Sequence, residues 1–269
     1  MAKANEELIE KIQMLRPIDD TFFEVLADDV EFCEEILQII LQDEKLKVLS
    51  VIVQKSVRNL VGRSVRVDAL CQLGTGEKVN IEVQRSDKDH HLKRIRYNAS
   101  CITASETEPG ERFENVPTVI MVYISEFDFL KGNRTIYHID NVVRETGAAI
   151  DNGLHIVCVN AKIDDGTDIA ELMKCFMQTE VDNQKFPAVS KRMKYLKHSE
   201  GGLEKMCKIM EDYAKEYTKE YAKEVMQSHT DEQIKNALDK GKRPEDIADF
   251  IGVSLDRVNK VKDGKTILV

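Results

Sequence analysis

The sequence predicts a mixed α/β domain that is followed by a C-terminal helical extension. Two observations lead to this fold class. In residues 18–179, segments with apolar residues at helical spacing alternate with runs of β-branched and aromatic residues, whereas charged helical repeats follow Gly201 and Gly202. The 269 residues, of which 42% are hydrophobic and 32% charged, are enough for one medium domain with an appendage and suit a soluble globular protein.

The first half of the domain begins with a helix and continues into a sheet. We expect the helix over residues 18–42, where Asp19 or Asp20 can cap its start. A β-rich strip follows at residues 47–59, and the alternating residues 64–85 predict a β-hairpin around a Gly-Thr-Gly turn.

The second half of the domain repeats this alternation of helix and strand. Residues 88–105 have helical character and end before Glu108, Pro109 and Gly110, which break helices. Runs rich in β-branched and aromatic residues predict three strands, at 117–125, 135–143 and 153–161, and a helix is expected at 168–179.

The C-terminal extension contains two kinds of helical pattern. Residues 213–224 place a tyrosine every fourth position, which predicts a charged connecting helix, with a weak self-association surface as the alternative. Residues 230–262 are typical of a helix-turn-helix unit, and its small, turn and apolar anchor positions are Ala248, Gly252, Val258 and Val261. We expect Thr230 or Asp231 to cap the first helix of this unit and Pro244 to begin the next.

Charge, cysteines and hydropathy exclude several classes of function. The net charge of -9 and the pI of about 5.3 argue against a general polyanion-binding surface, although the stretch from Arg85 to Arg96 has five basic and two acidic residues. Six cysteines are scattered singly, which favours reduced, mostly buried thiols over a zinc site. No apolar run approaches the roughly 20 residues of a membrane span, and the N-terminus lacks a signal-peptide pattern, so we expect a cytoplasmic protein without membrane association.

The predicted hairpin carries the candidate site. If its loop is centred on Thr75, opposed residues have numbers that sum to 150, so that Asp68 faces Glu82 and Arg66 faces Gln84. Directly opposed Cβ atoms lie about 4.5–5.5 Å apart. Alternation puts Glu82 and Gln84 on one face, while the other face is apolar, so the register should be well specified.

Two carboxylates held side by side repel each other, and a divalent cation removes that conflict. Mg²⁺ is commonly bound through one or two carboxylates together with waters and substrate phosphates. Such an ion can activate water for attack on a phosphodiester. The placement of Asp68 and Glu82 therefore permits a metal-dependent phosphodiesterase, and acidic residues on a solvated sheet face are the alternative.

An Asp in one strand and Glu-x-Gln in the next resemble the core of the PD-(D/E)XK nuclease superfamily, with Gln where Lys is usual. More narrowly, the chain resembles the PD-(D/E)XK nuclease family transposases, which are akin to the recombination-promoting nucleases (Rpn). The resemblance covers most of residues 15–225. The stretches that carry it are LRPIDDTFFEVL, NLVGRSVRVDAL, GEKVNIEVQRSDK, KRIRYNAS, YHIDNVVRETG and LMKCFMQT.

The resemblance implies a restriction-endonuclease-like fold, in which helices flank a mixed sheet. It also implies an endonuclease that hydrolyses DNA with Mg²⁺, or with Mn²⁺ or Ca²⁺ in its place, in association with transposition or recombination. Carried over to this chain, Asp68, Glu82 and the carbonyl of Val83 would hold the metal, and Gln84 would take the position of the usual Lys. A Gln can orient the attacking water but adds no positive charge in the transition state.

Basic residues near the hairpin are the candidate contacts to DNA. They are Arg66 on the hairpin and Arg94, Arg96 and Tyr97 on the helix that follows it, with surface charge and a packed tyrosine as the alternative.

Further polar residues have weaker claims to the site. Asp20 or Glu24 could add an acidic group behind the carboxylates, although capping and solvation explain them better. His90 and His91 as general bases are a further alternative, although water activation here belongs to the metal.

These patterns predict a chain in three parts. They are a PD-(D/E)XK nuclease-like domain in residues 1–198, a charged connecting helix in 199–228 and a small helix-turn-helix-like unit in 229–269. The expected partner is DNA, and a homodimer is expected if the chain cuts both strands as related nucleases often do. The alternative functions are a DNA-binding or regulatory protein with a weak or inactive nuclease core, and an intracellular scaffold without nucleic acid.

Overall fold

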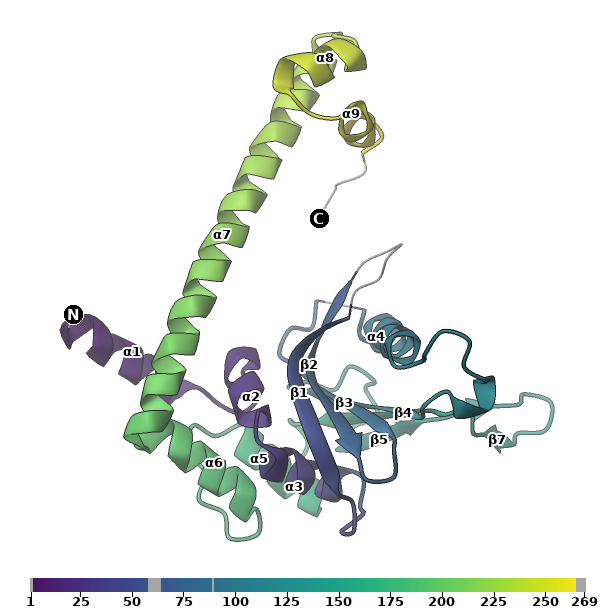
Figure 1. Ribbon diagram of the computed structural model, residues 1–269, viewed down its shortest axis with the longest axis vertical. Coiled ribbons are helices and arrows are strands. Elements are labelled where there is room, and N and C mark those ends of the chain that lie inside the picture. The colour runs from purple at the N-terminus through teal and green to yellow at the C-terminus, as the bar shows by residue number, and fades with distance from the viewer. Residues whose placement is uncertain (1, 58–63, 89, 265–269) are drawn as a thin grey trace. The chain divides into compact units, whose positions relative to one another are not determined.

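The computed structural model describes residues 2–57, 64–88 and 90–264 (Figure 1). The chain divides into two compact units, Met1–Lys208 and Ile209–Val269. None of the helices in the described ranges has the length and apolar character that crossing a membrane requires.

A six-stranded mixed sheet forms the centre of the first unit, with the strand order β1-β2-β3-β4-β8-β5. Its strands are β1 (Val48–Val57), β2 (Val65–Leu73), β3 (Lys78–Gln84), β4 (Val119–Ser125), β5 (Ile136–Ile139) and β8 (Leu154–Asn160). The first three strands pair antiparallel, β4 lies parallel to both β3 and β8, and β5 closes the edge antiparallel to β8. Two short strands, β6 (Asn141–Val142) and β7 (Ala149–Ile150), form a separate ribbon.

Helices cover both faces of this sheet (Figure 1). On one face, α2 (Asp20–Ala27) and α3 (Val30–Ile40) pack on the first strands, and α5 (Asp168–Phe176) and α6 (Pro187–His198) pack against α3. On the other face, α4 (His91–Ser105) contacts β1, β2 and β4. The unit also contains α1 (Ala2–Met14) and a single 3₁₀ turn, η1 (Phe113–Asn115). The predicted mixed sheet flanked by helices is confirmed, and it is consistent with the restriction-endonuclease-like fold.

The helix predicted over residues 18–42 is two helices, α2 and α3. The side chain of Asp29 caps α3 by accepting a hydrogen bond from the Phe32 N–H at 3.0 Å. This cap requires an extended backbone at Asp29, which ends the continuous helix that apolar spacing predicts. Asp19 holds the N-cap position of α2, but its carboxylate accepts from the Arg16 N–H, at 2.7 Å, and makes no cap bond to the described helix.

The sheet face beneath α4 changes from apolar to polar along the strands. Its apolar cluster consists of Val67, Leu70, Ile95, Ala99, Ile102, Val119, Met121, Tyr123 and Cys158. On β3, the alternating residues Asn80, Glu82 and Gln84 are polar and nevertheless buried. Buried polar groups usually have hydrogen-bond partners, so we expect partners for these side chains on the elements that cover this part of the face.

Lys197 is a buried cation that ties α6 to chain segments far from it in sequence. Its Nζ atom donates to the carbonyls of Gln13 (2.8 Å) and Leu15 (2.7 Å) and also to that of Thr179. The same atom lies 5.4 Å from the centroid of the Phe22 ring. Burial lowers the pKa of this ammonium group, yet three carbonyl acceptors keep its donors satisfied.

The substitution Lys197→Met should lower the free energy of unfolding by about 3 kcal/mol, because it leaves three carbonyl oxygens without their donor. Urea denaturation followed by circular dichroism measures this change. Lys194→Met on the exposed side of the same helix is the matched control and should stay within about 0.5 kcal/mol of the natural chain. Equal midpoints for the two variants would show that the buried ammonium does not stabilise the fold.

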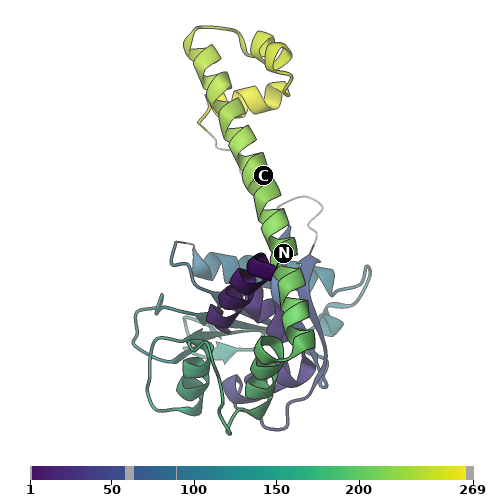
Figure 2. The ribbon, with the colours of Figure 1, turned by 90° about the vertical axis from the view of Figure 1, so that its left-hand side faces the viewer.

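The second unit is helical. α7 (Glu200–Asp239) contributes residues to both units as one continuous helix (Figure 2), and α8 (Pro244–Ile251) and α9 (Leu255–Lys262) follow it. A small core joins the end of α7 to these two helices and consists of Ile234, Ile247, Ala248, Val258 and Val261. The predicted helical extension is confirmed, and Gly252 ends α8 with a left-handed backbone (φ 76°).

The ends of the C-terminal helices agree with the sequence in part. Pro244 is the first residue of α8, as predicted. The caps predicted at Thr230 and Asp231 are wrong, because both residues lie inside α7. The division of the chain into three functional parts stays a prediction.

Candidate active site

The hairpin of β2 and β3 has the register that its turn predicts. Ala69 pairs with Ile81 and Leu70 with Asn80, so that the numbers of paired residues sum to 150. Asp68 is next along β2, and its Oδ2 atom accepts a hydrogen bond from the Val83 N–H of β3 at 3.0 Å. This bond links Asp68 to the neighbour of Glu82 on the opposite strand.

Glu82 is a fully buried carboxylate with donors on both oxygens. Its exposed fraction is 0%. Arg94 Nε donates to Oε1 at 2.8 Å, and Oε2 accepts from the side-chain amides of Asn98 (2.8 Å) and Asn80 (3.3 Å). The alternative of a solvated sheet face is therefore wrong for Glu82, which lies under α4.

The spacing of residues on β3 and α4 explains how these donors meet the carboxylate. Asn80 and Glu82 are two apart on a strand and so share a face. Arg94 and Asn98 are four apart on a helix and so lie one turn above each other. The apolar residues Ile95 and Ile102 hold this side of α4 against the sheet. The helix thus brings one cation and one amide onto a charge that would otherwise be costly to bury.

The electrostatics of the site disfavour the ionised form of Asp68. Burial raises the pKa of the Asp68 carboxyl group well above its ordinary value, and the neighbouring charge of Glu82 raises it further. The charge of Asp20, the first residue of α2, acts in the same direction, whereas the Val83 N–H and Arg94 lower the pKa. The carboxylates of Asp68, Glu82 and Asp20 thus act on one another, and the guanidinium group of Arg94 offsets part of their repulsion.

Arg94 is firmly cationic. Burial lowers the pKa of its guanidinium group, but the charge and hydrogen bond of Glu82 outweigh that effect and raise the pKa above its ordinary value. The guanidinium group of Arg94 therefore carries its positive charge at any physiological pH. In the pair of Arg94 and Glu82, the acidic member is fully buried and the basic member is 37% exposed at the side chain.

The residues present fit a hard divalent cation in their chemistry. Carboxylate oxygens and a backbone carbonyl are the ligands that Mg²⁺ takes, usually few in number and completed by water. Asp68 is half-buried, and within the described residues its Oδ1 atom has no hydrogen-bond donor. In the same ranges, no three side chains of His, Cys, Asp or Glu are grouped to hold a metal, and both Glu82 oxygens already accept hydrogen bonds. The charge is thus in place, but the ligand atoms of Glu82 are engaged.

A groove of about 640 Å³ leads to this site between the start of β2 and α4. All four predicted DNA contacts line it, together with residues that sequence reasoning did not assign. The lining residues are Ser64, Val65, Arg66, His90, Lys93, Arg94, Arg96, Tyr97 and Asn98. Arg66, Lys93 and Arg96 are exposed, and none of them has a carboxylate partner in the part of the chain that the structure describes. Arg94 and Asn98 line the groove and also contact Glu82, so these two side chains lie between the groove and the buried carboxylate.

Gln84 lies at the edge of this arrangement. It is 9% exposed, and its Nε2 atom donates to the Ser86 carbonyl at 3.0 Å, so that its amide is engaged by the loop after β3. Its catalytic role stays a prediction.

His91 is packed in an aromatic cluster. Its Nδ1 atom lies 3.0 Å from the Tyr123 hydroxyl, and its ring centroid lies 5.1 Å and 4.9 Å from those of Phe127 and Phe129. This environment suits a structural role for His91, and the idea that it is a general base receives no support.

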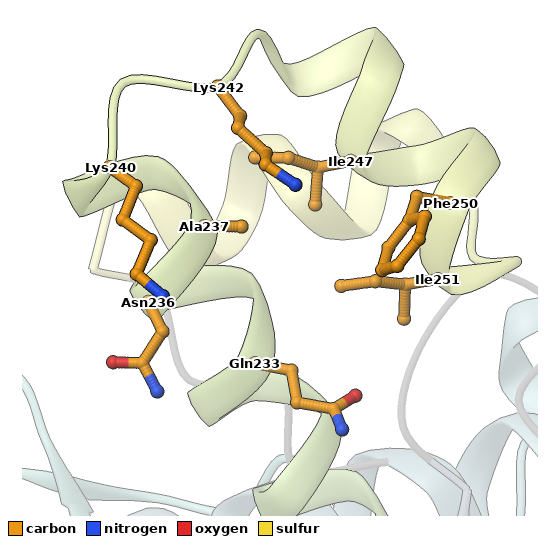
Figure 3. Close-up of a pocket in the computed structure, with 8 residues that line it drawn as sticks. All are labelled: Gln233, Asn236, Ala237, Lys240, Lys242, Ile247, Phe250 and Ile251. Carbon is orange, nitrogen blue, oxygen red and sulfur yellow. The ribbon is translucent and has the colours of Figure 1, made fainter.

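The C-terminal unit offers less to DNA than the groove does. On α9, Arg257 binds Asp231 of α7 at 2.9 Å and Lys260 binds Asp256 at 2.7 Å. A pocket of about 440 Å³ between the end of α7 and α8 has an exposed Phe250 ring at its rim (Figure 3). No Asp, Glu, His or Cys is among its described lining residues, so it lacks the usual side-chain ligands of a metal ion. Contact of residues 229–269 with DNA stays a prediction.

Comparison with known proteins identifies one family. The family model described as PD-(D/E)XK nuclease family transposase matches residues 30–241. The match includes both strands of the hairpin and all of α4, and it ends before α8. No curated protein and no solved structure gave a significant match.

Proposed function

The chain belongs to the PD-(D/E)XK nuclease family transposases, and from this premise we propose that it is a metal-dependent DNA endonuclease whose active site contains Asp68 and Glu82. One observation carries the proposal: two carboxylates on adjacent strands lie behind the wall of a groove, and the groove's exposed cations Arg66, Lys93 and Arg96 have no carboxylate partner among the described residues. Mg²⁺ is the proposed ion, with Mn²⁺ and Ca²⁺ as substitutes.

The groove is proposed to hold the DNA backbone. Arg66, Lys93 and Arg96 present positive charge to phosphates, which favours binding without reading the base sequence. Tyr97 lies on the same wall and offers a ring against the sugar or a base. The net charge of -9 makes this local patch the part of the first unit that we expect to attract DNA.

The carboxylates and the Val83 carbonyl would hold the ion. When bound, the ion supplies an activated water and neutralises charge that develops on the phosphodiester. Asp68 has to be ionised for this role, and its raised pKa means that a cation also relieves the repulsion between Asp68 and Glu82. Gln84 is proposed to orient the attacking water after its amide leaves Ser86, and Asp20 to add negative charge from α2.

Arg94 and Asn98 are proposed to act on Glu82 itself. Asn98 and Asn80 fix the orientation of the carboxylate by donating to Oε2. Arg94, which also lines the groove, is proposed to supply to the phosphate the positive charge that Gln84, in the position of the usual Lys, does not provide. A homodimer that cuts both strands stays a prediction.

Cleavage of supercoiled plasmid tests the proposal. The purified chain should nick or linearise the plasmid with Mg²⁺ or Mn²⁺, and excess EDTA should stop the reaction because the carboxylates alone cannot activate water. Gel electrophoresis of the plasmid over time measures the rate, and adding Mg²⁺ back after EDTA is the control for irreversible damage. Cleavage that continues at full rate in EDTA would overturn the metal-dependent mechanism.

A further inference from the structure

The contact between Arg94 and Glu82 poses a problem for any cation that uses Glu82 as a ligand. Arg94 Nε lies 2.8 Å from Oε1, and Asn98 and Asn80 occupy Oε2. The guanidinium group of Arg94 therefore places a positive charge next to the carboxylate oxygen that a metal ion would have to bind. The like charges repel, and the low dielectric of a fully buried site strengthens that repulsion.

The side chain of Arg94 can leave Glu82 and bind an anion in the groove instead. Its side chain is 37% exposed, whereas Glu82 is fully buried, so the ion pair has one fixed member and one movable member. Arg94 lines the groove together with Arg66, Lys93 and Arg96, where an anion would be surrounded by cations. A phosphate accepts two parallel hydrogen bonds from a guanidinium group and competes well with a carboxylate for it.

We propose that Arg94 is a gate operated by a phosphate anion: in the free protein it occupies Glu82, and a DNA phosphate in the groove draws it away so that Glu82 can bind the metal ion. This inference rests on the proposed function and adds an order of events to it. Metal and DNA then bind with positive coupling, because each favours the arrangement in which Arg94 has left the carboxylate. By linkage, the factor by which DNA tightens the metal equals the factor by which the metal tightens DNA.

The gate would restrict assembly of the metal site to protein that has DNA in its groove. Free Mg²⁺ would meet a protein whose second carboxylate is closed, so the site would assemble only where a phosphodiester is present. The adjacent carboxylates of Asp68 and Glu82 supply the attraction for the ion once Arg94 has moved.

Binding of Mn²⁺ tests the gate without relying on cleavage. Electron paramagnetic resonance counts the free ion in titrations of the full chain, alone and with a saturating short duplex whose phosphorothioate linkages slow hydrolysis. We expect the duplex to lower the Kd of the protein for Mn²⁺ by about tenfold. The same titration with Glu82→Gln corrects for ions that bind the duplex itself and should show no such change.

Two variants of the gate separate charge from position. Arg94→Gln should bind Mn²⁺ about tenfold more tightly than the natural chain when no DNA is present, and the duplex should add little. Arg94→Lys keeps the positive charge and should, like the natural chain, bind Mn²⁺ weakly when no DNA is present. Arg96→Gln removes a cation of the same groove that does not contact Glu82 in the described structure, so it should weaken the duplex but leave the Mn²⁺ affinity of the protein alone unchanged.

The outcomes distinguish the gate from the function on which it rests. If Mn²⁺ binding depends on Glu82 but is the same with and without the duplex, or if Arg94→Gln weakens it, the gate is wrong and the metal site stands. If Glu82→Gln binds Mn²⁺ as the natural chain does under both conditions, the metal site and the gate both fall. The titrations with and without the duplex use the natural chain, so they test the gate even if Arg94→Gln does not fold.

Discussion

The substitution Glu82→Gln should lower the rate of plasmid cleavage on the order of 10³-fold or more while the protein stays folded. Gln has the shape of Glu and keeps an acceptor oxygen for Asn98, so the packing beneath α4 survives. It removes the charge that a metal ligand supplies. Arg94 loses its partner in the same step, but its side chain is 37% exposed and can reach water, which limits the cost in stability. Initial rates of plasmid nicking in Mg²⁺ measure the effect.

A matched control lies on the same hairpin. Glu77 is at the turn, where its carboxylate accepts from the Thr75 hydroxyl and takes no part in the site. Glu77→Gln should cleave within about twofold of the natural chain, a difference well below the effect of losing a group that acts in the transition state. Circular dichroism of both variants shows whether they fold. Full activity in folded Glu82→Gln would place the chemistry outside the hairpin.

The hairpin was predictable because its information is local. The turn fixes which residues pair, and alternation fixes which face they share, so Ala69, Leu70 and Cys71 pair with the residues that counting from the turn gives. The same register brings the side chain of Asp68 close to β3, where it accepts a hydrogen bond from the Val83 N–H. One strand pair thus determined the position of both candidate metal ligands, although their roles as ligands rest on the family resemblance.

The partners of Glu82 were not predictable from the same pattern. Arg94 and Asn98 are 12 and 16 residues away along the chain, and they reach the carboxylate only because α4 packs across the sheet. Their four-residue spacing, beside the apolar Ile95 and Ile102, was a usable sign that both face the core. Arg94 was instead assigned to DNA, which its place in the groove also allows.

Two further features were not predicted, one because a local cap interrupts an apolar pattern and one because its contacts are distant in sequence. The long helix of residues 18–42 was predicted from apolar spacing that continues through the break, but the local cap at Asp29 prevails over that pattern. Lys197 looks like any charged residue of a surface helix, since its three acceptors come from Gln13, Leu15 and Thr179. No local pattern records contacts of that range.

The substitution Asp68→Asn should abolish cleavage and at the same time stabilise the metal-free protein by about 1 kcal/mol at neutral pH. Asn keeps an acceptor for the Val83 N–H but removes a charge that burial and Glu82 both disfavour. A residue that only holds the fold together would lose stability on substitution, whereas a residue kept for binding an ion gains it. Urea denaturation in EDTA measures the stability, and plasmid nicking in Mg²⁺ measures the activity.

The pH dependence of this gain follows from the direction of the pKa shift. Folding raises the pKa of Asp68 above its unfolded value of about 3.9, so the folded state holds the proton more tightly. The stability that Asp68 contributes is therefore complete below that value and is lost as the pH rises through the folded pKa. Asp68→Asn has no proton to lose, so its advantage should be present at neutral pH and disappear near pH 4 or below. Asp140→Asn, at an exposed position between β5 and β6, should show no such trend. A loss of stability in Asp68→Asn at neutral pH would mean that the carboxylate serves the fold, and it would remove the electrostatic reason for a cation at this site.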